Sequence, residues 1–549
     1  MSEQSTAQIS LGRGRERLTA RAAWLFLWVA LIPLLYVPQA LIGVKEPGVL
    51  VVAILSTAAA VCALLLLRTR LWDRLADLLA PRAWILLLLG IVLYVAASIH
   101  HGLRTIGSFG DADQTALFNQ MLWNTLHGHP FATSSETLDG SLGSHFGIHF
   151  SPTLLLLLTV YALWPGPQVL VVVQALAVGL IPIPLYLLLR PRAGAAGAAL
   201  LALAVLLVPP LLQLGGSDFR EHALLPVFLL TALWALETRR PAFLWVSLLL
   251  ALGIREEVGA VLVFLGLYAL LTGRGRALWL PMAALGVAWL LVAVRIVMPH
   301  FWSPQLWSDP WRRFQDVSGF PGRTPAEMAF GLLHRPGPLF HAIVNRSNVD
   351  YLYHAFRALL LIPPWGDAAL LLAVPGLMTN LLSPLIYMKL PYAQYTLVPL
   401  VFAALATMRV AVRVSSRALP ERGAGAGLTA AIVVGCGLLP SQASPVSLET
   451  PPHVPLDAAR EVVRSLRPGE AVYAPPNFYV QIGGRKIVGC SDQLHDRMLD
   501  PAIRIQYDRV ILWPGDLPAE TTLVRQMAAD TRFRREPAPE PFLVYRRRS

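Results

Sequence analysis

The sequence has little charge and few cysteines for its length. Only 14% of its 549 residues are Asp, Glu, Lys or Arg, whereas 55% are hydrophobic. Because a soluble protein of this length encloses its core with a much smaller apolar fraction, the composition argues against a soluble chain and indicates a polytopic membrane protein. The three cysteines, Cys62, Cys436 and Cys490, have neither the number for a disulfide framework nor the spacing of metal ligands.

Several common catalytic signatures are also missing. The segment after the last apolar run has no glycine-rich phosphate loop and no nucleophile paired with a base. No internal repeat is evident along the chain. Candidate chemistry therefore has to be sought in the loops between the apolar runs.

Acidic residues are fewer than basic ones, and the net charge of +12 suggests a nucleic-acid partner. The placement of the arginines explains this charge better, because they cluster between alternate apolar runs. The clusters are Arg68/Arg70/Arg74, Arg190/Arg192, Arg239/Arg240, Arg274/Arg276 and Arg409/Arg413/Arg417. Short loops rich in Arg or Lys stay on the cytoplasmic side of a membrane. We therefore expect the lipid bilayer, and no nucleic acid, as a partner of this chain.

The apolar runs fit a multi-pass topology with every arginine cluster inside. The first two, 22–44 and 49–67, approach or exceed the roughly 20 residues that cross a bilayer. The first run is too long for a signal-peptide core, so an uncleaved anchor is expected. We expect about 13 spans, with the N-terminus cytoplasmic and the C-terminus extracytoplasmic. They lie near 23–43, 49–67, 84–99, 167–189, 195–214, 223–237, 241–254, 258–272, 277–298, 355–364, 367–383, 395–410 and 424–440.

One further apolar segment, FSPTLLLLLTVYALW at 150–164, resembles a span but does not fit this scheme. It is short for a crossing, and counting it would place every later arginine cluster outside. We therefore expect a juxtamembrane or re-entrant helix on the outer face.

The expected fold class is mainly α, a polytopic transmembrane helical protein with a small C-terminal extracytoplasmic α/β domain. The domains expected are 1–83 (cytoplasmic N-terminus and two extra spans), 84–440 (main membrane domain) and 441–549 (tail). Polar composition marks 100–166 and 299–354 as outer loops. In the tail, 457–468 is a helix candidate, and 471–476, 486–490 and 509–515 are strand candidates.

Two acids, Asp111 and Asp113, follow the third long apolar run in the stretch GSFGDADQTALFNQMLWNTLHG. One interpretation is structural: Asp111 caps an amphipathic helix that ends at Gly128, and Gln114 completes a capping box. Helical spacing would point the two carboxylates about 200° apart, so they share a metal ion only if the strip is extended. The other interpretation is that the pair forms a catalytic site in an outer loop.

Two histidines lie further along the same loop. His145 and His149, in GSHFGIHFSP, have the spacing of metal ligands on a helix, but Gly147 between them argues against a regular helix. The alternative is a pair of interfacial histidines without a ligand role.

Other polar clusters occur at the outer ends of different spans. Ionisable groups at membrane depth are costly and usually mark a site or a cavity. For the cluster at 255–257, the alternative is a hairpin tip exposed to water. Together the clusters predict one extracytoplasmic cavity. Their members are Asp218, Arg220, Glu221 and His222; Arg255, Glu256 and Glu257; and Lys389 with the nearby Tyr392.

The acidic motif in the first large outer loop resembles the GT-C superfamily of integral-membrane glycosyltransferases. The element HFSP, which opens a juxtamembrane helix, and a span that ends in PLYLLLR add to the likeness. More closely, the chain is similar over roughly 84–520 to the bacterial family called domain of unknown function 2079. The strings that carry this resemblance are DQTALFNQMLWNTLHG, HFGIHFSPTLLLLL, VLVVVQALAVGLIPIPLYLLL, FREHALLP, REEVG, LLLAVPGLMTNLLS and AVYAPPNFYVQIGGRKIVG with YDRVILW.

The resemblance implies glycosyl transfer from a polyprenyl-phosphate-linked sugar to an unknown acceptor on the outer face of the cytoplasmic (inner) membrane, in the cell envelope. It implies Asp111 or Asp113 as the base, with a slight preference for Asp111, and a cation at the lipid phosphate. The resemblance leaves a divalent metal, Mg²⁺ or Mn²⁺, open, with Asp111 and Asp113 as its ligands. The residues expected to bind substrate are Gln114, His145, His149, Arg220, Glu221, His222, Arg255, Glu256, Glu257, Lys389 and Tyr392.

Two other functions are compatible with the sequence. A transporter would also place charges among many spans, but it would usually show matched halves and broken helices near the midplane. A non-catalytic scaffold for envelope assembly is the second alternative.

Overall fold

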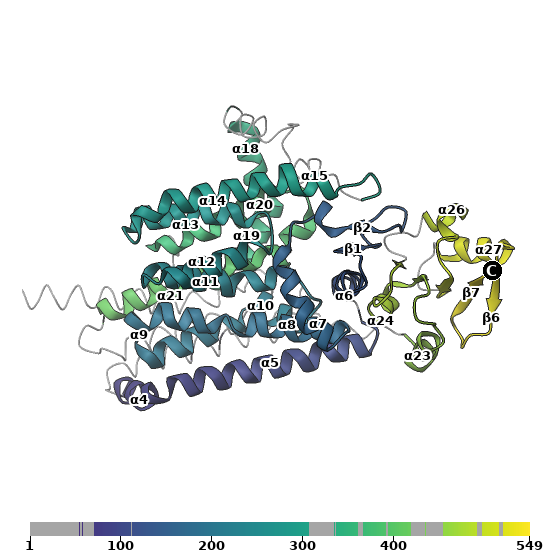
Figure 1. Ribbon diagram of the computed structural model, residues 1–549. Helices are drawn as coiled ribbons and strands as arrows, with labels where there is room; N and C mark the ends of the chain where they lie inside the picture. The colour runs from purple at the N-terminus through teal and green to yellow at the C-terminus, as the bar shows by residue number, and fades with distance from the viewer. Residues whose placement is uncertain are drawn as a thin grey trace, which may run out of the picture.

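Apolar helices form most of the chain in the computed structural model. It describes residues 71–110, 112–306, 336–360, 366–390, 393–418, 454–490, 497–514 and 520–548, together with the isolated positions Ile54, Ala58, His334 and Val434. The helices form an elongated bundle, and a small unit of strands and short helices, the tail, caps one end of it (Figure 1). Helix α6 (Asp113–Leu126) and strands β1 (Ala132–Thr133) and β2 (Gly143–Ser144) lie between the bundle and the tail.

The bundle consists of helices from two described stretches. The first stretch contributes α4 (Leu71–Leu79), α5 (Ala83–Gly107), α7 (Leu157–Leu163), α8 (Pro167–Gly179), α9 (Pro182–Ala204), α10 (Pro209–Gly216), α11 (Leu225–Glu237), α12 (Pro241–Leu252), α13 (Val258–Thr272), α14 (Trp279–Val292) and α15 (Met298–Phe301). The second contributes α18 (Pro336–Ile343), α19 (Arg346–Leu360), α20 (Val374–Leu382) and α21 (Leu397–Ala418). Shorter helical turns used below are η4 (His145–Gly147), η5 (Pro152–Leu156), η7 (Glu221–Leu224), η11 (Ala368–Ala373) and η12 (Ile386–Lys389).

Four helical stretches of the described chain are long and apolar enough to cross a membrane. They are Asp73–Gly107, Pro167–Leu207, Arg276–Phe301 and Gln394–Arg417, and the bent pair Pro210–Gly216 with Glu221–Glu237 makes a fifth if it is one span. Pro167–Leu207 has 41 residues and would measure about 60 Å, twice the hydrocarbon thickness. It turns at Gly194, whose φ of 69° suits glycine, and this turn separates the predicted spans 167–189 and 195–214.

Other span predictions have mixed outcomes. The predicted spans 23–43, 49–67 and 424–440 lie outside the described residues apart from isolated positions, so the count of about 13 stays a prediction. The predicted span 355–364 begins inside α19, which starts at Arg346, and its last residues, 361–364, lie outside the described chain. The segment at 150–164 forms η5 and α7, an apolar helix of Pro152–Leu163, and its length of about 18 Å is too short for a crossing.

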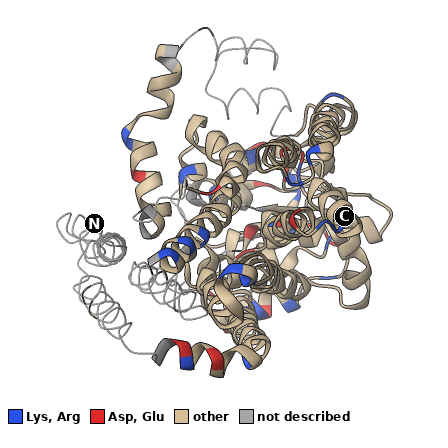
Figure 2. Ribbon diagram, turned by 90° about the vertical axis from the view of Figure 1, so that its left-hand side faces the viewer, with Lys and Arg blue, Asp and Glu red and all other residues tan. Residues whose placement is uncertain are grey.

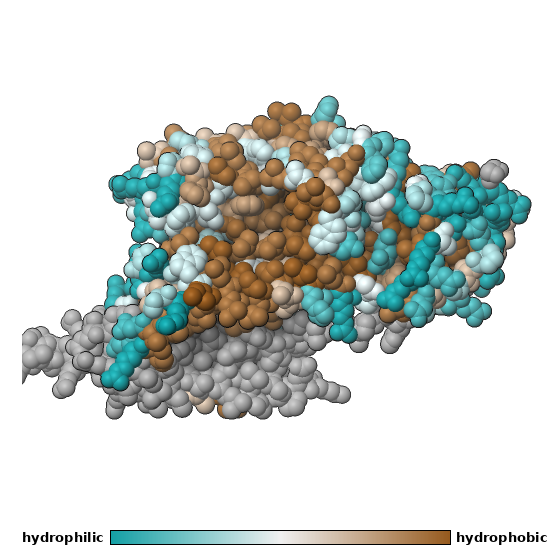
Figure 3. All heavy atoms as spheres, turned by 60° about the horizontal axis from the view of Figure 1, so that its bottom comes forward, coloured by the Kyte–Doolittle hydropathy of each residue, from teal (hydrophilic) through white to brown (hydrophobic). Residues whose placement is uncertain are grey.

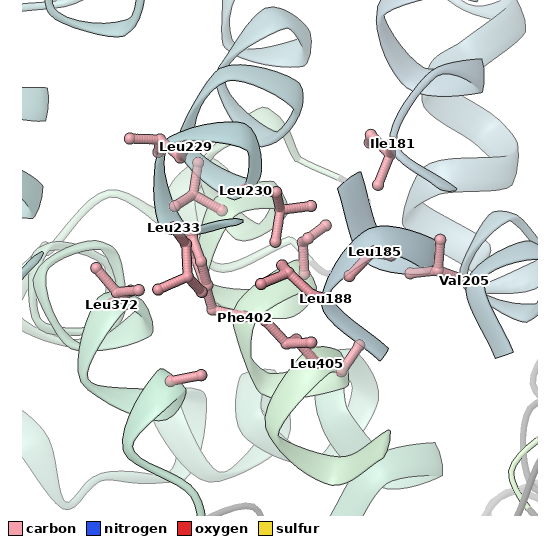
Figure 4. Close-up of a cluster of buried hydrophobic side chains, with 14 of the residues drawn as sticks. Ile181, Leu185, Leu188, Val205, Leu229, Leu230, Leu233, Leu372, Phe402 and Leu405 are labelled. Carbon is pink, nitrogen blue, oxygen red and sulfur yellow. The ribbon is translucent and has the colours of Figure 1, made fainter. Parts of the chain in front are cut away.

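The apolar side chains pack inward on the central helices and outward on the peripheral ones. Leu185 and Leu188 of α9 meet Leu229 and Leu233 of α11 and Phe402 of α21 in the centre (Figure 4). The spans Asp73–Gly107 and Arg276–Phe301 are only 22% buried, whereas Gln394–Arg417 is 83% buried. The exposed apolar residues form a belt between hydrophilic ends (Figure 3), as expected when lipid covers the outer helices.

The end of the bundle opposite the tail carries basic residues. Figure 2 looks onto that end, where blue segments mark Lys and Arg at several helix ends. Two of these arginines are anchored: Arg409 pairs with Glu237 at 2.9 Å, and Arg413 pairs with Asp367 at 3.0 Å. This end is the one that the arginine clusters predict to be cytoplasmic.

The tail contains a five-stranded mixed sheet in the order β4-β3-β5-β7-β6. Its strands are β3 (Val472–Ala474), β4 (Val488–Cys490), β5 (Arg509–Leu512), β6 (Phe533–Glu536) and β7 (Leu543–Arg547). Helices α23 (Leu456–Arg464), α24 (Tyr479–Ile482), α26 (Pro501–Arg504) and α27 (Glu520–Ala529) accompany it. The predicted helix and the three predicted strands fall at α23, β3, β4 and β5, whereas the hairpin β6–β7 was not predicted from the sequence.

Candidate functional site

The acidic strip, the short segment that contains Asp111 and Asp113, lies where α5 ends and α6 begins. Asp111 is outside the described residues, and Asp113 is the first residue of α6. The residue before the helix is Ala112, which supplies no side-chain cap. Asp218 takes that role, because its carboxylate accepts hydrogen bonds from the backbone N–H of Gln114 at 3.0 Å and of Thr115 at 2.7 Å.

The capping role predicted for Asp111 lies outside the described residues and stays a prediction, whereas the cap from Asp218 is observed. The first N–H groups of a helix lack partners within it, and a carboxylate from another element satisfies two of them here. The Thr115 hydroxyl also donates to Asp218, at 2.7 Å. Sequence spacing cannot reveal this cap, because its carboxylate lies 104 residues from Gln114 along the chain.

The loop that carries Asp218 is itself held by α8 and by an ion pair. The side-chain amide of Gln174 on α8 donates to Leu214 O at 2.8 Å and to Asp218 O at 3.2 Å. The Oε1 atom of the same side chain accepts from Arg220 N at 3.1 Å. Arg220 pairs with Asp218 at 3.1 Å. Helices α6, α8 and α10 thus share one polar junction next to the acidic strip.

Two predicted clusters meet at a buried ion network. Glu221 opens η7, where the helix pair bends by 115°, and Arg255 lies in the turn between α12 and α13. The Arg255 guanidinium donates to Glu221 at 2.7 Å and lies 3.6 Å from Glu257. His222 Nε2 is 2.9 Å from Glu257, whose side chain is 41% exposed. The alternative of a water-exposed hairpin tip is wrong, because Arg255 and Glu256 are buried.

The two loop histidines join this network from the other side. His145 Nδ1 lies 3.0 Å from Glu136, and His149 Nδ1 lies 3.0 Å from Glu256. Gly147 ends a single turn of η4, so the pair does not lie on a regular helix, although the two rings are 5.6 Å apart. Over the described stretches, no group of three or more His, Cys, Asp or Glu side chains is arranged to hold a metal ion.

The charges of this network, named here the Glu–His–Arg network, almost all lie away from water. Ions in such surroundings lose several kcal/mol of hydration each, so they persist only when paired. Four carboxylates face one guanidinium and three imidazoles. Its members are Glu136, Glu221, Glu256, Glu257, Arg255, His145, His149 and His222.

An open groove of about 500 Å³ lies near this network and contains Lys389. The His222 ring is 5.3 Å from Tyr395, and Tyr395 is 6.0 Å from Tyr387, two residues before Lys389. Burial lowers the pKa of Lys389. The groove is lined by Arg346, Ser347, Asp350, Tyr351, His354, Ile386, Lys389 and Leu390.

Helix α6 is covered on two sides. Leu117, Phe118 and Met121 pack in one apolar cluster with α7 and α8. On the tail side, Gln120 and Asn124 donate to Lys486 O at 3.0 and 3.2 Å. These polar side chains therefore pair with the backbone beside edge strand β4.

A family model described as predicted membrane protein (DUF2079) matches residues 109–459, more than half of the chain. The chain belongs to this family. The resemblance drawn from the sequence motifs is thereby confirmed. The DUF2079 match begins at the acidic strip and extends to α23, so it includes every member of the Glu–His–Arg network.

Other comparisons show weaker likeness. No curated protein matches the chain. Two solved structures of ArnT from Cupriavidus metallidurans, one bound to undecaprenyl phosphate and one in the apo state, are 14% identical to it. Each match covers 83% of this chain and 97% of the ArnT chain, with a TM-score of 0.41. This likeness is too weak to assign an activity to the DUF2079 protein.

The structure brings most of the predicted site residues of this DUF2079 member to one region. The clusters at 218–222 and 255–257 touch, and both histidines join them. Lys389 instead lines the groove, while Asp111 and Tyr392 lie outside the described residues. The sequence interpretation missed Glu136 and Tyr395. The polar run TSSET at 133–137, buried throughout, was the available signal for Glu136.

Proposed function

We propose that this DUF2079 protein is a membrane glycosyltransferase, which moves a sugar from a polyprenyl-phosphate donor to an acceptor on the outer face of the cytoplasmic membrane. The observation that carries the proposal is the capping of α6 by Asp218. Because Asp218 bonds to the N–H groups of Gln114 and Thr115 and precedes Glu221 by three residues, it holds the start of α6, with Asp113, beside the Glu–His–Arg network. Acids at the polar end of an apolar bundle, in a strip that resembles the GT-C acidic motif, favour a catalytic role.

In the proposed reaction one of these carboxylates is the general base. It takes the proton from the acceptor hydroxyl as that oxygen forms a bond to the anomeric carbon. The bond from the anomeric carbon to the phosphate oxygen breaks, and the lipid phosphate leaves with the electron pair. We retain the preference for Asp111 as the base. A metal ion held by Asp111 and Asp113 stays a separate proposal, and no step here passes through it.

The leaving phosphate needs a cation, and Lys389 fits that role better than Arg255. Arg255 is buried and already pairs with Glu221 and Glu257, so a phosphate would have to displace a carboxylate. Lys389 lies in the open groove beside Arg346 and His354. Positive charge there stabilises the developing phosphate dianion.

The experiment compares purified Asp111→Asn and Asp113→Asn variants with the parent protein in a polyprenyl-phosphate-sugar transfer assay. An amide cannot accept the proton, so replacing the base should lower turnover by about 10²-fold or more with expression unchanged. Asp77→Asn, on the exposed face of α4, is the matched control and should behave as the parent. If the parent turns over and both Asn variants match it, neither carboxylate is the base.

A non-catalytic scaffold is the second candidate, and one observation favours it. The Glu–His–Arg network pairs its own members, as a purely structural lock would. The same assay separates the two functions, because a scaffold shows no turnover with any polyprenyl-phosphate sugar.

A further inference from the structure

The tail binds the acidic strip itself, in addition to docking on α6. The last carbonyl groups of a helix lack partners within it. At the end of α5, side chains of the tail donate to two of these carbonyl groups. Gln481 donates to Ile106 O at 2.6 Å, and Arg460 lies 3.4 Å from Gly107 O. Asn477 donates to Phe109 O at 3.1 Å, two residues before Asp111.

Phe109 holds an unusual backbone conformation in this strip. Its φ is 57°, in the left-handed region that a bulky residue rarely adopts. Such a conformation is strained and persists only where its surroundings impose it. Its ring packs edge-on against Phe478 of the tail at 5.1 Å, and Phe478 in turn meets Phe542 at 5.1 Å.

The strip and the tail also share one apolar core. Ile106, Phe109, Ala112 and Ala116 belong to the same cluster as the inward side chains of α23, β3 and α24. The approach is close, because a Cβ atom on Gly483 would lie 3.0 Å from Ala116 O. The strip is thus held from both ends, by the tail at α5 and by Asp218 at α6.

We propose that the tail is a positioning element of the membrane enzyme, and that Asn477 and Gln481 are positioning residues for the acid that takes the acceptor proton. This inference rests on the proposed glycosyl transfer. Docking alone does not require these contacts, because Gln120, Asn124 and Ser134 already bind the backbone around β4. Asn477 and Gln481 instead bond to the carbonyl groups that precede the acids.

The experiment uses the full-length Asn477→Ala/Gln481→Ala double variant. We expect kcat to fall by about 10- to 100-fold, because a misplaced reacting group costs rate. The KM for the donor should change by less than about threefold, the pattern of an interaction that acts in the transition state. Hydrogen exchange at the amides of Phe109 and Gly110, which bond to Ile106 O and Thr105 O, should become at least about tenfold faster.

Two further variants separate positioning from folding. Gln526→Ala removes a tail side chain that, among the described residues, bonds to Arg504 of the tail at 2.7 Å. This variant should leave both readouts unchanged. Gln481→Lys keeps a donor of similar reach. The Asn477→Ala/Gln481→Lys variant should therefore recover most of the kcat that the Asn477→Ala/Gln481→Ala variant loses.

The outcomes decide the proposal whether or not the transfer activity is found. A double variant with parental kcat and parental exchange overturns it, and so does a loss of activity that Gln526→Ala shares. If the parent shows no transfer, the proposed function fails, and exchange alone then decides: unchanged exchange at Phe109 and Gly110 overturns the positioning role, and faster exchange supports it.

Discussion

At the scale of single residues, the polar side chains of the site are matched to partners far away in the sequence. Asp218 serves α6 from a loop after α10, and Arg255 pairs with Glu221 from the turn before α13. A buried ion that loses its partner keeps the full desolvation cost, whereas removing both partners leaves no uncompensated charge. We therefore expect replacing Arg255 to lower stability more than replacing Asp218 does.

Arg255→Met should lower the free energy of unfolding by about 3–5 kcal/mol, because Glu221 would be left buried without its guanidinium. Adding Glu221→Gln should recover a large part of that loss. Thermal unfolding in detergent measures both variants, with Arg192→Met, on an exposed position, as the control. A double variant no more stable than Arg255→Met alone would contradict the pairing.

Asp218→Ala should lower stability by about 0.5–2 kcal/mol, the usual cost of losing a helix cap. Asp218→Asn should cost an intermediate amount, since its single amide oxygen can replace only one of the two carboxylate oxygens that accept from Gln114 and Thr115. Hydrogen exchange at those two amides is the direct readout. Equal protection in the alanine variant and the parent would show that another group caps α6.

At the scale of elements, the contact between α13 and α14 depends on two glycines. A Cβ atom added to Gly259 of α13 would lie 2.3 Å from Gly286 O of α14, and one on Gly286 would lie 2.3 Å from Gly259 O. Small residues let helix backbones approach closely in membranes, where packing replaces the hydrophobic driving force.

Gly259→Ala should therefore separate α13 from α14 and destabilise the protein by about 1–3 kcal/mol, the cost of overpacking. Gly337→Ala on α18 is the control, because a Cβ atom there meets nothing within 4 Å in the described structure. The midpoint of thermal unfolding in detergent measures the difference. Equal midpoints for the two variants would argue against the close crossing.

At the scale of the whole molecule, the apolar belt separates two unlike ends. One end carries the basic helix ends, and the other carries the acidic strip, the Glu–His–Arg network and the tail (Figures 1 and 2). Because short basic loops stay in the cytoplasm, the opposite end and its candidate site should face outward.

A topology reporter fused after residue 441 should accordingly be active only outside the cytoplasm. Alkaline phosphatase, which needs the oxidising exterior to form its disulfides, and a cytoplasm-dependent fluorescent protein make a matched pair of reporters. If only the cytoplasm-dependent reporter is active, the predicted orientation is wrong. The site would then lie on the wrong side of the membrane for a lipid-linked donor.

Local patterns in the sequence determined the class of the protein and the type of most elements. Apolar runs, arginine clusters and the string DQTALFNQMLWNTLHG were enough to predict a helical membrane protein, helix α6, the short helix at 150–164 and four elements of the tail. These features depend on residues close together in the chain, through helix length, charge placement and capping chemistry.

Only the tertiary structure decided which side chains share a partner. Asp218 caps α6 from a distant loop, Glu136 pairs with His145, and Asn477 reaches the carbonyl group of Phe109. Each of these contacts joins groups from different elements. Burial in a low-dielectric interior strengthens the contact and makes either group costly to leave unpaired. Sequence spacing contains no record of that shared burial, because it arises only when the bundle and the tail pack around the strip.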